Sequence, residues 1–175
     1  MNEERLENHV LNMIYEELKQ ANVNRNYAGD LIDKQVMSTT WFNVVIASLS
    51  AGGAILSIVG SLIPIITSGL AAIGLLANQF YPVFFLKTDD LTKLIRLQTD
   101  YNIYFNKVQN LFNIADARGM SATDAQNALS KLIEDNASKA TEISKIFGKI
   151  NKKMEKNAIA KSEEYLNSVY HDSED

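Results

Sequence analysis

The chain contains no cysteine and only two prolines among its 175 residues. Without cysteine it has no disulfide framework, no thiolate metal site and no cysteine nucleophile. It also lacks an excess of positive charge, because 17 Lys and Arg stand against 21 Asp and Glu, for a net charge of -4. Binding to nucleic acid depends on a basic patch. We therefore expect no direct nucleic-acid partner.

Charge of either sign is missing from a long internal stretch. Residues 35–86 contain no Asp, Glu, Lys, Arg or His, although 22% of the whole chain is charged. Gly60, Ser61 and Pro64 mark a short turn, since proline is best tolerated in the first turn of a new helix. The two halves, 41–63 and 64–86, are each long enough to cross a hydrocarbon core of ~30 Å. The sequence therefore predicts a two-span transmembrane hairpin within 35–86.

The positive charges predict how such a hairpin would be oriented. Four Lys and Arg precede the uncharged stretch and thirteen follow it, with none in the turn. By the positive-inside rule, both termini are expected in the cytoplasm and the protein in the bacterial inner membrane. A secretory signal is not expected, because 34 acidic-leaning residues come before the apolar stretch.

Small and polar residues recur on one face of each predicted span. They are the candidate site: Asn43, Ala47, Ser50, Ala54, Ser57 and Ser61 in the first span, and Thr67, Ala71, Gly74 and Asn78 in the second. Such stripes allow two helices in lipid to approach closely and hydrogen-bond. They are also suited to line an uncharged pore in an oligomer. The sequence leaves helix packing and pore lining open as alternatives.

The flanking regions predict amphipathic helices, so the expected fold class is all-α. Residues 1–34 form an N-terminal helix and 87–175 a helical domain, both on the cytoplasmic side. Apolar side chains recur at helical spacing in these regions: Leu6, Val10, Met13, Ile14, Leu18 and Ala21, then Leu91, Leu94, Ile95, Tyr101, Tyr104, Phe105, Val108, Leu111, Phe112 and Ala115, then Ala125, Ala128, Leu129, Leu132 and Ile133.

Several helix boundaries can also be predicted. Asn22, Asn24, Asn26 and Gly29 are expected to break or loosen the first helix. Thr88, followed by two aspartates, favours a helix start. Arg118 and Gly119 are expected to end that helix, and the spacing of Ser121 and Asp124 is typical of the next N-terminal cap. A last helical segment, 157–170, places Ala158, Ser162, Tyr165, Leu166 and Val169 on one stripe.

This order of elements resembles the SLATT family, the SMODS- and SLOG-associating two-transmembrane effectors of bacterial conflict systems. The residues that carry the resemblance are Tyr27 before the first span, the hairpin, the run 94–111 with Tyr101 and Tyr104, and Lys156, Ala158, Tyr165 and Leu166 near the end. It covers nearly the whole chain as a pattern of elements. The resemblance implies a pore-forming or membrane-disrupting effector, held inactive until a nucleotide-sensing or infection-sensing partner releases it.

No enzyme signature accompanies this pattern. His9 and His171 lie at opposite ends of the chain, without another ligand at metal-binding spacing. The adjacent glutamates Glu16 and Glu17, like those at 163 and 164, are typical of a solvated helix face. The glycines of the uncharged stretch are not followed by the Lys-Ser/Thr of a phosphate-binding loop. We expect no catalytic site, metal or cofactor.

The main functional hypothesis is therefore an anti-phage effector that oligomerises and permeabilises the bacterial inner membrane. Its expected partners are the lipid bilayer, further copies of itself and a sensing protein. Three alternatives stay open: a holin-like protein or membrane anchor, a soluble α-helical pore-forming toxin whose hairpin inserts, and a soluble bundle with the hairpin buried at its centre.

Overall fold

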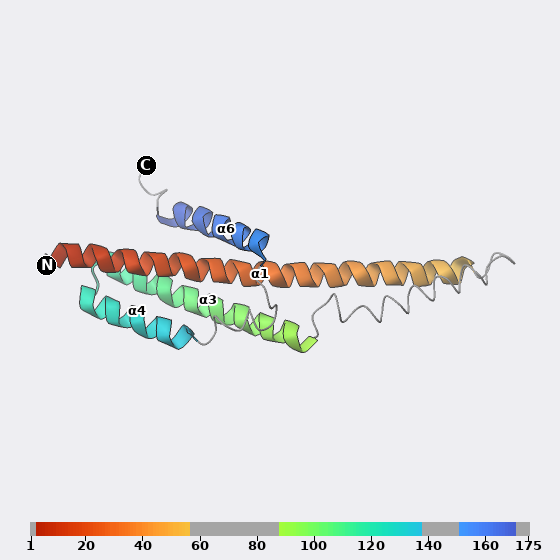
Figure 1. Ribbon diagram of the computed structural model, residues 1–175, viewed down its shortest axis with the longest axis horizontal. Helices are drawn as coiled ribbons and strands as arrows, with labels where there is room; N and C mark the ends of the chain where they lie inside the picture. Colours follow the sequence, from red (N-terminus) through yellow and green to blue (C-terminus); the bar gives the residue numbers. More distant parts are fainter. Residues whose placement is uncertain (1–2, 57–87, 138–150, 171–175) are drawn as a thin grey trace. The chain divides into compact units, whose positions relative to one another are not determined.

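The computed structural model of the chain describes residues 3–56, 88–137 and 151–170. These residues form four helices: α1 (Glu3–Leu56), α3 (Thr88–Asp116), α4 (Ala122–Asn136) and α6 (Lys152–Tyr170) (Figure 1). The chain divides into two units. The first, which we call the bundle, comprises Met1–Leu31 and Thr92–Asp175, and the second unit comprises Ile32–Leu91.

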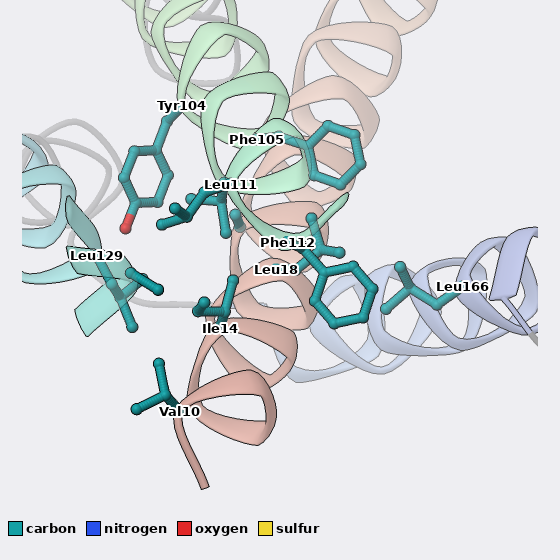
Figure 2. Close-up of a cluster of buried hydrophobic side chains, with 12 residues drawn as sticks. Val10, Ile14, Leu18, Tyr104, Phe105, Leu111, Phe112, Leu129 and Leu166 are labelled. Atoms are coloured by element: carbon teal, nitrogen blue, oxygen red, sulfur yellow. The ribbon is translucent and has the colours of Figure 1, made fainter. Parts of the chain in front are cut away.

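The core of the bundle is built on α1 and α3, which run antiparallel (Figure 1). Val10, Ile14 and Leu18 of α1 are at most 2% exposed, and Phe105 of α3 is equally buried. Figure 2 shows Leu129 of α4 and Leu166 of α6 on opposite sides of these α1 side chains. The apolar stripes predicted on these four helices therefore meet in one core, with α4 and α6 flanking the central pair.

The first helix continues through the asparagines that were predicted to break it. Asn22 is fully buried, Tyr27 is 6% exposed and Ala28 is fully buried. The burial of this part of α1 stabilises the helix by more than the few tenths of a kcal/mol by which each asparagine disfavours it. At Gly29, an added Cβ would lie 3.1 Å from Nε2 of Gln98 on α3. The predicted break is thus wrong, and Gly29 lies inside the helix, where a larger side chain would meet only the end of the Gln98 side chain.

The turn between α3 and α4 agrees with its predicted residues. The Gly119 N–H donates to the Ile114 carbonyl over 2.8 Å, and Arg118 has a φ of 54°. A left-handed residue after the last helical turn is a common helix ending. Ser121 Oγ then accepts a hydrogen bond from the Asp124 N–H at 3.1 Å and donates to Asp124 Oδ2 at 2.7 Å. The predicted helix end and the predicted cap are both confirmed.

The last helix, α6, begins at an asparagine that bonds in two directions. The Asn151 side-chain oxygen accepts from the N–H groups of Lys153 and Met154, while its own N–H donates to the Tyr27 hydroxyl of α1 at 3.0 Å. Three residues after Asn151, and at every fourth residue from there on, a side chain of α6 is buried. The buried residues of α6 are Met154, Ala158, Ser162 and Leu166. Of the stripe predicted here, Val169 is 42% exposed and lies outside the interface.

The structure corrects the membrane part of the predicted fold class. Within 3–56, 88–137 and 151–170, no helix combines the length with the apolar content that a bilayer crossing requires. An integral membrane protein with a transmembrane hairpin is therefore wrong, and so is the inner-membrane location with cytoplasmic termini that followed from it. Of the first predicted span, only residues 41–56 are described, and these 16 residues are fewer than the ~20 that a helix needs to cross the hydrocarbon core. The second predicted span, 64–86, and residues 57–63 of the first lie outside the described residues.

Candidate interaction surface

The part of α1 that belongs to the second unit exposes large apolar side chains. Trp41 is 65% exposed, Met37 59%, and Val44 and Val45 50% each. At ~100° per residue these four positions fall within an arc of about 100° on the helix surface. We call this surface the Trp41 stripe. Contiguous exposed apolar surface, above all with tryptophan at its centre, is typical of a site of macromolecular contact.

The Trp41 stripe was not predicted from the sequence. Its signal was present in the spacing of Met37, Trp41, Val44 and Ser48, which follow one another by four, three and four residues. That spacing marks one side of a helix. The prediction concentrated on small and polar residues instead, because it assumed that the apolar ones face lipid.

Only part of the predicted site lies where its side chains are described. Asn43 and Ala47 are exposed on α1, on the arc next to the Trp41 stripe. Ser50 and Ala54 belong to the α1 helix, but their side chains are not described. The remaining candidates lie outside the described residues: Ser57, Ser61, Thr67, Ala71, Gly74 and Asn78. Packing and pore lining therefore both stay predictions for these positions.

Within the bundle, a polar group sits where α1, α3 and α6 meet. The Arg25 guanidinium lies 4.1 Å from the centre of the Phe105 ring and 5.5 Å from that of Tyr165. Burial lowers the pKa of Arg25 from its ordinary value. The Tyr104 hydroxyl donates to Glu17 Oε1 at 2.7 Å, and burial, assisted by this bond, raises the pKa of Tyr104. The contacts of Arg25 and the hydrogen bond of Glu17 thus join α1 to α3, and the contact of Arg25 with Tyr165 joins α1 to α6.

Polar contacts also fix the helix α6 along α1. Lys19 Nζ pairs with Glu163 Oε1 at 2.9 Å, and the hydrogen bond raises the pKa of Lys19. The buried Ser162 hydroxyl donates to the Lys19 carbonyl at 3.2 Å. A second ion pair joins Lys161 to Asp30. Of the glutamates predicted to lie on solvated faces, Glu163 is exposed and pairs with Lys19 at the surface, whereas Glu17 is partly buried and accepts the hydrogen bond from Tyr104.

No arrangement for catalysis emerges from the described residues. In the ranges searched, no three His, Cys, Asp or Glu side chains lie close enough together to hold a metal ion. His9 is exposed on α1, and His171 lies outside the described residues.

Comparison of the chain with protein-family models, with curated proteins and with solved structures found no match. The resemblance to SLATT effectors stays a prediction that rests on the pattern of elements. The same holds for the sensing partner and for the membrane-permeabilising activity that the resemblance implies.

Proposed function

We propose that this chain is a self-associating helical module, in which the Trp41 stripe of α1 packs against the same stripe of a second copy. The observation that carries the proposal is the clustering of Met37, Trp41, Val44 and Val45 within one arc of a helix that is exposed around most of its circumference. Burying a side chain of this size on association contributes ~1.5–3 kcal/mol in the hydrophobic transfer term. Four of them in each copy supply a hydrophobic driving force that opposes the entropic cost of association.

The absence of charge favours a second copy as the occupant. Residues 35–56 of α1 contain no ionisable side chain. A charged partner would gain nothing from this surface, whereas an identical helix meets it without repulsion between like charges. The four-three-four spacing around Trp41 is also that of helices that pack side by side with interdigitated side chains. A two-fold arrangement, in which each stripe contacts its own copy, fits these properties.

The bundle gives this module an independent fold. Its helices bury their own apolar faces, as Ile14, Leu18 and Phe105 illustrate with 0–1% exposure. Association through the Trp41 stripe therefore does not require the core of the bundle to open. A charge placed on the stripe is expected to abolish association and leave the fold intact.

Sedimentation velocity of the full-length chain over a range of concentrations tests this proposal. The wild-type chain is expected to shift from monomer to dimer as concentration rises, while Trp41→Asp and Val44→Asp remain monomeric. Ile133→Asp is the matched control, because Ile133 is an exposed apolar residue of α4, at 42%, outside the stripe. Circular dichroism should show equal helix content in all four proteins.

Two results would contradict the proposal. One is a wild-type chain that stays monomeric at every concentration. The other is a Trp41→Asp variant that associates as strongly as the wild type and the Ile133→Asp control.

A further inference from the structure

The helix α6 buries less apolar surface in the bundle than α3 does. Ala158 and Ser162 of α6 are fully buried but small, and Met154 is 9% exposed. Within Lys152–Tyr170, Leu166 alone is both large and almost completely buried, at 1%. The helix α3 buries large side chains along most of its length: Leu94, Leu97, Tyr101, Tyr104, Phe105, Val108, Leu111 and Phe112. Because the hydrophobic contribution follows the apolar area removed from water, α6 separates from the bundle at a lower free-energy cost than α3.

Polar contacts supply much of what holds α6 on α1 and α3. Two ion pairs join it to α1, and the Gln109 amide of α3 donates to the hydroxyls of Tyr165 at 3.1 Å and Tyr170 at 3.3 Å. The N–H of Asn151, just before α6, adds the hydrogen bond to Tyr27. Water replaces each of these partners when the helices separate, so their net contribution to stability is small.

Aromatic side chains of α3 lie beneath α6. The Phe105 ring packs edge-on against Tyr165, with ring centres 5.9 Å apart, and Phe112 packs in the same way against Tyr170 at 5.0 Å. With α6 in place, Phe105 is 1% exposed and Phe112 is 7% exposed. The Arg25 guanidinium lies over the Phe105 ring from the side of α1. Departure of α6 therefore uncovers a surface of aromatic rings and an arginine.

We propose that α6 is a detachable helix, which leaves α1 and α3 while these two helices and α4 stay packed, and which thereby controls when this aromatic surface is accessible. Proteins open locally in cooperative units, and the units with few buried apolar contacts open first. The three remaining helices keep a common core, in which Ile14 of α1, Leu111 of α3 and Leu129 of α4 are buried. This inference goes beyond the proposed self-association and does not depend on it.

Single introduced thiols test the proposal in the full-length chain, because the chain has no cysteine of its own. Ala158→Cys of α6 and Ala21→Cys of α1 are matched reporters, since both alanines are fully buried. Ser162→Cys, also at a fully buried position, is a second reporter on α6 in which the side chain hardly changes size. The rate at which a thiol reagent labels each variant, over a range of urea concentrations, measures how often that position becomes accessible.

The two α6 reporters are expected to be labelled at least about tenfold faster than Ala21→Cys in the absence of urea. Their labelling should also depend less on urea, because release of one helix exposes less surface than unfolding of the whole bundle. Circular dichroism and urea unfolding of each variant provide the global stability against which its labelling rate is compared.

The ion pair at Glu163 gives a second test, in the Ala158→Cys background. Glu163→Gln should raise the labelling rate about two- to fivefold, the range for an exposed ion pair. Glu164→Gln is the matched control, because Glu164 is an exposed neighbour on α6 that forms no ion pair with a described residue. The difference between the two variants should disappear in 1 M salt, which screens the pair.

The proposal is overturned if Ala158→Cys and Ser162→Cys are labelled no faster than Ala21→Cys and with the same dependence on urea. In that case α6 would open only when the whole bundle unfolds. It is also overturned if Glu163→Gln is labelled at the same rate as Glu164→Gln at low salt.

Discussion

The two parts of α1 use apolar residues in opposite ways. In the bundle, Val10, Ile14 and Leu18 are 0–2% exposed, and charged residues occupy the other side of the helix. In the second unit, Trp41 and Val44 are 65% and 50% exposed on a stretch that has no charge at all. A surface that is apolar and uncharged has no favourable partner in water. The first part of α1 is thus a core helix, and the second part is the exposed surface on which the proposed self-association rests.

The largest expected effect is the difference in folding stability between alanine variants of Phe105 in the bundle and Trp41 in the second unit. Phe105 is 1% exposed in the bundle, so Phe105→Ala should destabilise the fold by ~3–5 kcal/mol through lost burial and the cavity left behind. Trp41→Ala, at a position that is 65% exposed, should change folding stability by less than ~0.5 kcal/mol. Urea denaturation of dilute protein measures both. Equal losses in the two variants would show that Trp41 belongs to a core.

A gain of stability is expected at Asn22. This side chain is fully buried, and neither its amide nitrogen nor its amide oxygen has a hydrogen-bond partner among the residues that the structure describes. An unpaired buried amide costs ~1–3 kcal/mol, so Asn22→Leu, which keeps the number of side-chain heavy atoms and the branch at Cγ, should stabilise the bundle by that amount less the cost of fitting its larger methyl groups. Thermal unfolding measures the change, with Asn24→Leu, a partly exposed neighbour, as the control. A destabilised Asn22→Leu would mean that the amide makes a necessary bond.

The bond between Tyr104 and Glu17 predicts a dependence on pH. The pKa of Tyr104 is raised in the folded chain above the value of about 10 for an unfolded tyrosine. The contribution of the protonated Tyr104 to the free energy of unfolding is therefore fully present below pH 10. It is lost as the pH rises beyond 10, because Tyr104 in the unfolded chain then releases its proton first. At pH 8, Tyr104→Phe should cost ~1 kcal/mol through the lost hydrogen bond.

At pH 11, the difference between Tyr104→Phe and the wild type should be smaller than at pH 8, since phenylalanine does not titrate. Urea denaturation of both proteins at the two pH values gives this difference directly. A gap of the same size at both values would exclude the titration of Tyr104 as its cause.

The smallest effect is expected at the ion pairs that hold α6. Lys19 and Glu163 have side chains that are 36% and 51% exposed, and water and salt screen such a pair. A double-mutant cycle with alanine should give a coupling below ~1 kcal/mol. The pair Lys161–Asp30 is the comparison, because its Asp30 side chain is only 19% exposed and its coupling should be larger. A stronger Lys19–Glu163 coupling would contradict this order.

How far the sequence predicts this molecule depends on whether local or distant residues decide each feature. The cap at Ser121 and the turn at Gly119 were predictable, because both need only groups within a few residues. The continuity of α1 through Asn22 was not, since it depends on α3 and α6, which are distant in sequence. Helical periodicity also did not predict which residues lie at the edge of a buried stripe. Ile95 and Val169 were placed on the predicted stripes, but their side chains are 46% and 42% exposed.

The candidate surface was predicted only in part, and for a physical reason. Counting charges located the unusual stretch 35–86 correctly as a feature of the sequence. Interpreting it as membrane-spanning also required a helix that is both long and apolar enough to cross a bilayer, and the described residues contain none. The spacing around Trp41 was visible in the sequence, but its exposure followed only from the placement of the helices.

The fluorescence of Trp41 tests the central claim most directly, because it is the only tryptophan in the chain and lies at the centre of the proposed contact. Emission and acrylamide quenching of the full-length protein are measured over the concentrations used for sedimentation. In dilute solution the tryptophan should emit as a solvent-exposed residue and be readily quenched. With rising concentration, its emission should move to shorter wavelength and quenching should fall, in parallel with dimer formation. Emission and quenching that stay the same while the chain dimerises would contradict the account, because the contact would then lie elsewhere.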